Sequence, residues 1–116
     1  KLPVSAPFHC SLMSKATMVM TEKLQKINFK QSKNILISNV TAEEISNIED
    51  LKQLLINQIE KRVRWRESIL NMINKGVNQF IEIGPGKVLS GLVKRINKDV
   101  KISSINSQSD IESLNI

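Results

Sequence analysis

Residues 79–89 read QFIEIGPGKVL and carry the clearest indication of fold class in the chain. The first five residues form a short, mostly apolar run that is typical of a strand and stops at a Gly-Pro-Gly turn. Apolar residues then return at helical spacing, which predicts a helix that begins near Lys87. A strand that leads directly into a helix indicates an α/β protein with a parallel sheet.

The same patterns continue on both sides of this turn. Apolar spacing of three and four residues predicts further helices at residues 9–27, at about 48–60 and from Trp65 to a left-handed cap at Gly76. Short apolar runs predict strands at 35–40 and 101–106, and a helical turn is expected at 110–114. The predicted fold is therefore a parallel sheet flanked by helices. Three strands are few for such a sheet, so we expect this chain to complete one that begins elsewhere.

Composition excludes several classes of protein. The 116 residues include one cysteine and one histidine, so the chain cannot form an internal disulfide or supply a four-ligand zinc site. No apolar run reaches the roughly 18 residues of a membrane-spanning helix, and the N-terminus has no signal-peptide pattern. We expect a cytoplasmic protein with no metal and no membrane partner.

The net charge of +6 raises the possibility of a nucleic-acid partner. The positive residues are mostly single lysines on helix faces, without an arginine-rich run or interleaved aromatic side chains. The sequence therefore predicts no binding of nucleic acid. A smaller basic group on one helix, which could dock an acidic partner, consists of Lys87, Lys94, Arg95 and Lys98.

The single histidine, His9, follows Pro7-Phe8 and stands where the first predicted helix begins. The N-terminus of a helix carries a partial positive charge, which disfavours a protonated ring. A neutral imidazole accepts a proton, as a general base must. The alternative is a histidine that only caps or packs against the helix.

No nucleophile accompanies this candidate base. Cys10 points about 100° away from its neighbour on a helix and is expected to be a buried filler. The chain contains no Gly-x-Ser-x-Gly elbow, since Val88 precedes Ser90. The Gly84–Lys87 segment lacks the flanking residues of a phosphate loop, which leaves a tight strand-to-helix turn or a role in shaping a nearby site.

Four segments together resemble the C-terminal third of the malonyl-CoA:acyl carrier protein transacylases. They are Leu2–Met13 with its Pro-Phe-His motif, Ser38–Val40, Val63–Trp65, and Glu82–Leu89 with its Gly-Pro-Gly-Lys motif. The resemblance covers essentially the whole chain, in order and at the expected spacings. It implies a hydrolase-like α/β core, with the small ferredoxin-like subdomain missing or reduced to the first few residues.

The resemblance also implies a ping-pong transfer of a malonyl group from coenzyme A, through a serine, to the phosphopantetheine thiol of acyl carrier protein. It places the general base at His9 and the main-chain carbonyl that orients this ring at Gln58. Asn39 is a candidate for the substrate site, with a turn-capping role as the alternative. Trp65 is expected to be a core anchor.

Parts of the family pattern are not present in residues 1–116. We expect the serine elbow, the arginine that pairs with the malonyl carboxylate and the glycine-rich oxyanion segment upstream of Lys1, so this polypeptide alone should be inactive. Arg62 stands where the family often has proline. Two alternatives therefore stay open, namely a non-catalytic remnant of a split or truncated transacylase and a basic module that docks an acidic partner.

Overall fold

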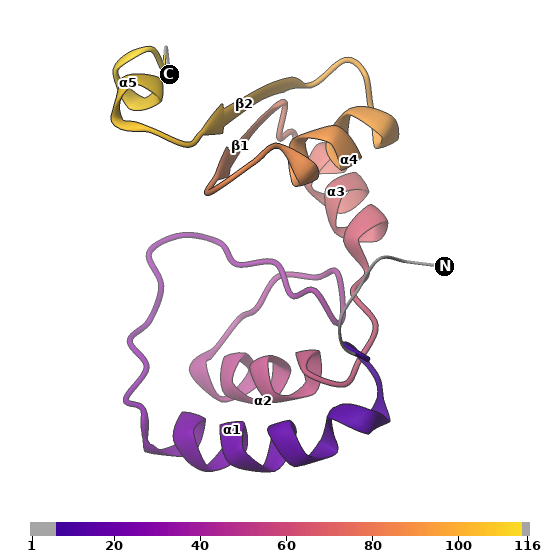
Figure 1. Cartoon of the computed structure of the whole chain (residues 1–116), viewed down its shortest axis with the longest axis vertical. Helices are drawn as coiled ribbons and strands as arrows, with labels where there is room; N and C mark the ends of the chain where they lie inside the picture. Colours follow the sequence, from indigo (N-terminus) through magenta and orange to yellow (C-terminus); the bar gives the residue numbers. More distant parts are fainter. Residues whose placement is uncertain (1–6, 115–116) are drawn as a thin grey trace. The chain divides into compact units, whose positions relative to one another are not determined.

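The computed structural model describes residues 7–114, and its internal contacts divide the chain into two units, Lys1–Ser68 and Ile69–Ile116 (Figure 1). Residues 1–6 begin the motif around the histidine and include the first few residues that would form the small subdomain if it is reduced rather than missing, and they lie outside the described residues. No helix within residues 7–114 has the length and apolar character needed to cross a bilayer.

The first unit is built on two helices that lie side by side, α1 (Ser14–Lys26) and α2 (Ile48–Gln58) (Figure 1). A short 3-10 helix, η1 (Ser11–Met13), precedes α1. The side chain of Asn47 begins α2 by accepting the main-chain N–H of Asp50 at 2.8 Å. This cap fixes the start of the helix that ends at Gln58.

The predicted strand at residues 35–40 is wrong. Only an isolated antiparallel bridge forms there, between Ile37 and Glu44, and Ile35 is 73% exposed rather than buried. The buried Ser38 hydroxyl accepts the main-chain N–H groups of Val40 and Thr41, which turns the chain. A serine side chain that bonds to nearby backbone groups competes with strand pairing, and at Ser38 the result is a turn instead of a strand.

The second unit contains a parallel strand pair, as the sequence predicts. Strand β1 (Gln79–Ile83) pairs with β2 (Lys101–Ile105), with Gln79 opposite Lys101 and Ile83 opposite Ile105. Helix α4 (Val88–Ile96) connects the strands and packs on both, burying Val93 (Figure 1). The fold class predicted from the sequence, α/β with a parallel sheet, is confirmed.

Two further helices have nearly the predicted bounds. Helix α3 runs from Trp65 to Asn74, and Gly76 follows it with a φ of +92°, the left-handed conformation expected of a glycine cap. Helix α5 (Gln108–Glu112) starts with a capping box between Ser107 and Asp110 and contacts β2. The indole nitrogen of Trp65 is buried without a partner among the described residues, although the side chain as a whole is only half-buried.

Candidate active site

His9 stands before the helix rather than in its first turn, which corrects the expected helix start at residue 9. Cys10 is the N-cap of η1, and its main-chain carbonyl accepts the Met13 N–H at 3.0 Å. The thiol of Cys10 is half-buried and donates to the Pro7 carbonyl at 3.1 Å, so it is not the buried filler that was expected. These contacts brace the turn that presents His9.

The backbone of His9 has a φ of +59°, in the left-handed region. A non-glycine residue pays on the order of 1 kcal/mol for this conformation, and such residues concentrate at functional sites. The ring itself is exposed. A strained backbone thus presents an accessible imidazole.

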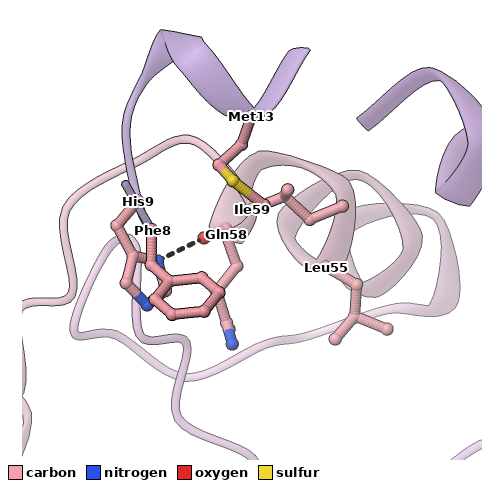
Figure 2. Close-up of a pocket in the computed structure, with 6 residues that line it drawn as sticks. All are labelled: Phe8, His9, Met13, Leu55, Gln58 and Ile59. Atoms are coloured by element: carbon pink, nitrogen blue, oxygen red, sulfur yellow. Dashed lines mark hydrogen bonds between the residues drawn. The ribbon is translucent and has the colours of Figure 1, made fainter. Parts of the chain in front are cut away.

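The ring of His9 is held by the end of α2. Its Nδ1 lies 2.7 Å from the main-chain oxygen of Gln58, across 49 residues of sequence (Figure 2). The last carbonyls of a helix have no partner within the helix, and here one of them binds a side chain. Because a carbonyl oxygen only accepts, Nδ1 carries the proton in this bond, which leaves the Nε2 lone pair available in the neutral ring.

A shallow pocket of about 250 Å³ surrounds this pair. Figure 2 shows its lining residues, Phe8, His9, Met13, Leu55, Gln58 and Ile59. Only His9 and Gln58 are polar, so the hydrogen bond lies among apolar side chains. The four apolar residues have no sequence signal of a site, although Phe8 and Ile59 are sequence neighbours of the two polar ones.

A second pocket, of about 190 Å³, shares Leu55 and Gln58 with the first. Its other lining residues are Leu36, Ile37, Ser38, Ile45, Leu51 and Leu54. Asn39 belongs to neither lining in the described part of the chain. Its main-chain oxygen accepts the Arg64 N–H at 2.8 Å, and the hydroxyl that caps this turn is that of Ser38.

The Gly-Pro-Gly-Lys segment forms the strand-to-helix turn that the sequence allows. Gly84 and Gly86 have φ values of +136° and +92°, and the Gly86 N–H donates to Oδ1 of Asn106 at 2.7 Å. The Glu82 carboxylate accepts the main-chain N–H groups of Leu89 and Ser90 in the first turn of α4. A carboxylate of the chain therefore occupies the place where a phosphate would bind.

The four basic residues predicted to share one helix do not all lie in it, because Lys87 is the N-cap of α4 and Lys98 follows its end. Lys94 Nζ donates to the main-chain oxygen of Lys98 at 3.1 Å, and Lys87 and Arg95 are exposed. Among residues 7–114 no three His, Cys, Asp or Glu side chains gather in a way that could hold a metal ion.

Comparisons with known proteins agree with the motifs. No protein-family model matches the chain. The malonyl CoA-acyl carrier protein transacylase of Bacillus subtilis is 44% identical over 111 residues, which are 96% of this chain and 35% of that protein. The crystal structure of the acyl-carrier-protein S-malonyltransferase from Bartonella henselae is 45% identical, with a TM-score of 0.90, over 97% of this chain and 36% of that one.

A third match is the structure of a type II PKS acyl-carrier protein in complex with its malonyl-transacylase. It is 33% identical, with a TM-score of 0.89, and the match covers 97% of this chain and 36% of that one. The chain thus spans about a third of the length of the relatives it matches. Over nearly all of its length it is similar to the C-terminal third of malonyl-CoA:acyl carrier protein transacylase, and the resemblance seen in its sequence motifs is confirmed.

Proposed function

We propose that this chain supplies the general base for malonyl transfer from coenzyme A to the phosphopantetheine thiol of acyl carrier protein. One observation carries the proposal, namely the 2.7 Å hydrogen bond from His9 Nδ1 to the Gln58 carbonyl. It fixes the tautomer whose Nε2 accepts a proton. Nε2 has no hydrogen-bond partner among the described residues, and the ring is exposed, so a hydroxyl can reach it.

The proposed chemistry has two half-reactions. His9 Nε2 takes the proton of a serine hydroxyl as its oxygen attacks the malonyl thioester, the C–S bond breaks, and the departing sulfur of coenzyme A takes that proton. In the second half, Nε2 takes the proton of the phosphopantetheine thiol. The sulfur attacks the malonyl-serine ester, the C–O bond breaks, and the serine oxygen recovers the proton.

The end of α2 supports both half-reactions. The C-terminus of a helix carries a partial negative charge, and the Gln58 carbonyl is the group that presents it to the ring. This charge stabilises the imidazolium that exists while the proton rests on Nε2. The carbonyl therefore orients the ring and stabilises its protonated form, as an aspartate does in a Ser-His-Asp triad.

The rest of the enzyme completes the proposal. Residues 1–116 form the C-terminal part of the acyltransferase α/β domain, and the serine, the carboxylate-binding arginine and the oxyanion segment come from the remaining part of the same enzyme. Asn39 is proposed only as a candidate for the substrate site. Coenzyme A enters the proposed reaction as part of the substrate malonyl-CoA, and the reaction uses no cofactor. We place the enzyme in the cytoplasm.

Acyl carrier protein is the proposed protein partner. A relative has been captured in complex with an acyl-carrier protein. In this chain the exposed Lys87 and Arg95 offer positive charge to an acidic partner. If this charge guides docking, the Michaelis constant for acyl carrier protein should rise with salt between low and physiological ionic strength.

The direct test is to co-express this chain with the remaining two thirds of the Bacillus subtilis relative and to measure formation of malonyl–acyl carrier protein. The His9→Ala variant should lose on the order of 10²- to 10⁴-fold in rate, the usual contribution of a general base. Lys15→Ala, an exposed residue of α1, is the matched control and should keep the full rate. Activity that does not depend on His9 would overturn the proposal, and a complex inactive with wild-type His9 would favour a non-catalytic remnant.

A further inference from the structure

The direction of the Gln58 carbonyl depends on how the chain leaves α2. The Lys61 N–H still bonds to the Asn57 carbonyl at 2.8 Å, and by Trp65 the chain has entered α3. Gln58 is the last residue of α2, so a change in this exit path rotates its peptide plane. Whatever fixes the path from residue 59 to residue 64 therefore fixes the partner of His9.

A rigid turn lies against the end of that path. Ser38 is 4% exposed, and its hydroxyl accepts the N–H groups of Val40 at 3.1 Å and Thr41 at 3.3 Å. The Ala42 N–H donates to the Ser38 carbonyl at 2.8 Å. The turn at 38–42 is thus bonded internally and buried at both of its ends, and its Asn39 and Thr41 carbonyls remain as acceptors for another segment.

Arg64 binds this turn at two points. Its main-chain N–H donates to the Asn39 oxygen at 2.8 Å, and its guanidinium Nη1 donates to the Thr41 oxygen at 2.9 Å. One hydrogen bond fixes a position, whereas two bonds to the same turn also fix a direction. The Arg64 carbonyl in turn accepts the N–H and the hydroxyl of the buried Ser68.

We propose that Arg64 is a positioning residue for the His9–Gln58 pair, through its two-point attachment to the turn at 38–42. It does not touch the ring. It holds the chain that follows Gln58, so that the carbonyl stays within 2.7 Å of Nδ1 and the ring keeps the Nδ1-protonated tautomer. The effect of Arg64 on catalysis rests on the proposed function, whereas its effect on the tautomer of His9 can be tested independently of that function.

Arg62 provides a matched control two residues away. Both arginines lie 3.5 Å from Oε1 of Glu67, so each replacement by alanine removes one positive charge and one contact with the same carboxylate. The side chain of Arg62 is 79% exposed and makes no hydrogen bond to the turn at 38–42 within the described part of the chain, whereas that of Arg64 is 41% exposed and reaches Thr41. Arg64→Ala therefore removes the side-chain bond to Thr41 in addition, whereas the main-chain bond to Asn39 is present in both variants.

The test is nitrogen-15 NMR of the imidazole ring in the full 116-residue chain. His9 is the single histidine, so its ring signals need no assignment, and they separate the protonated nitrogen from the unprotonated one. The wild-type chain should show Nδ1 protonated at neutral pH. Arg64→Ala should shift the ring toward the Nε2-protonated form, and Arg62→Ala should leave the wild-type pattern.

Ser38→Ala tests the same link without a large side-chain change, in case Arg64→Ala does not fold. It removes the hydroxyl that braces Val40 and Thr41 and should shift the tautomer in the same direction, whereas Ser46→Ala, on an exposed residue, should not. A wild-type ring protonated at Nε2, or Arg64→Ala and Ser38→Ala spectra equal to wild type, would overturn the inference. If Arg64→Ala and Ser38→Ala lose the Nδ1-protonated form but the completed wild-type enzyme has no transferase activity, the positioning role of Arg64 stands and the proposed function is refuted.

Discussion

The carboxylate of Glu82, on β1, accepts the main-chain N–H of Ser90 in the first turn of α4 at 2.7 Å. Its other oxygen accepts the N–H of Leu89 at 3.0 Å. Two free N–H groups of the helix are thus satisfied by a side chain from the preceding strand, and a negative charge stands at the positive end of the helix. This contact ties β1 to the start of α4 across the Gly-Pro-Gly turn.

The contact predicts an acid-sensitive stability. Hydrogen bonds from the Ser90 hydroxyl and N–H, and then from the Leu89 N–H, lower the pKa of Glu82 below its ordinary value of 4.5. A carboxyl whose pKa is lower in the folded state contributes stability that is fully present above pH 4.5 and is lost as pH falls through the folded value. Glu82→Gln should therefore lower the melting temperature at neutral pH and reduce its fall under acid.

Glu22→Gln, on the exposed surface of α1, is the control for this prediction and should leave the melting curve near that of wild type. Melting temperatures from pH 3 to pH 7, followed by circular dichroism, provide the measurement. An equal acid dependence in wild type and Glu82→Gln would show that this carboxylate does not stabilise the fold.

Gly86 and Gly91 should respond to alanine with opposite signs. Neither has an atom within 4 Å of the place of a Cβ, so packing does not decide the effect. Gly86 has a φ of +92°, and an alanine there should cost about 1 to 2 kcal/mol of unfolding free energy. Gly91 lies inside α4, where an alanine should add about 0.5 to 1 kcal/mol. Urea unfolding of both variants checks the pair, and effects of the same sign would contradict it.

The Asn47 cap should stabilise α2, the helix that ends at Gln58. Its Oδ1 accepts the Asp50 N–H at 2.8 Å, and replacing such a cap by alanine costs about 1 kcal/mol. Asn47→Ala should lower the unfolding free energy by that amount, whereas Asn47→Ser should keep most of it. Asn28→Ala, in an exposed loop, should have little effect on the same denaturation curve. A loss of similar size in Asn28→Ala would mean that the cap is not the cause.

In the completed enzyme, His9→Asn should reduce kcat and leave the KM for malonyl-CoA nearly unchanged. Asparagine tolerates the left-handed backbone that His9 adopts at a φ of +59°, so the turn should survive the substitution. It offers no ring nitrogen to accept the serine proton, which removes an interaction specific to the transition state. Steady-state kinetics test this, and a rise in KM at constant kcat would assign His9 to binding.

Local patterns predicted the second unit well. Apolar spacing and glycines that adopt positive φ indicate the strand at 79–83, the helix from Val88 and the strand from Lys101. Both signals depend only on residues that are close in sequence. The strand predicted at 35–40 failed for an equally physical reason. Its apolar residues suit a strand, but the buried hydroxyl of Ser38 bonds to its own backbone and makes a turn.

Apolar spacing indicated the other helices and the parallel strand pair correctly, although not the turn at 38–42, because propensity and periodicity act between near neighbours. The sequence also contained the motifs that carry the family resemblance, and through them it named His9 and Gln58. The long-range arrangement came from the folded chain alone: His9 precedes the helix with a left-handed backbone, and its ring meets the end of α2 across 49 residues. A hydrogen bond between such distant residues depends on the path of the whole intervening chain, including the turn at 38–42 and its attachment to Arg64, and no local pattern encodes that path.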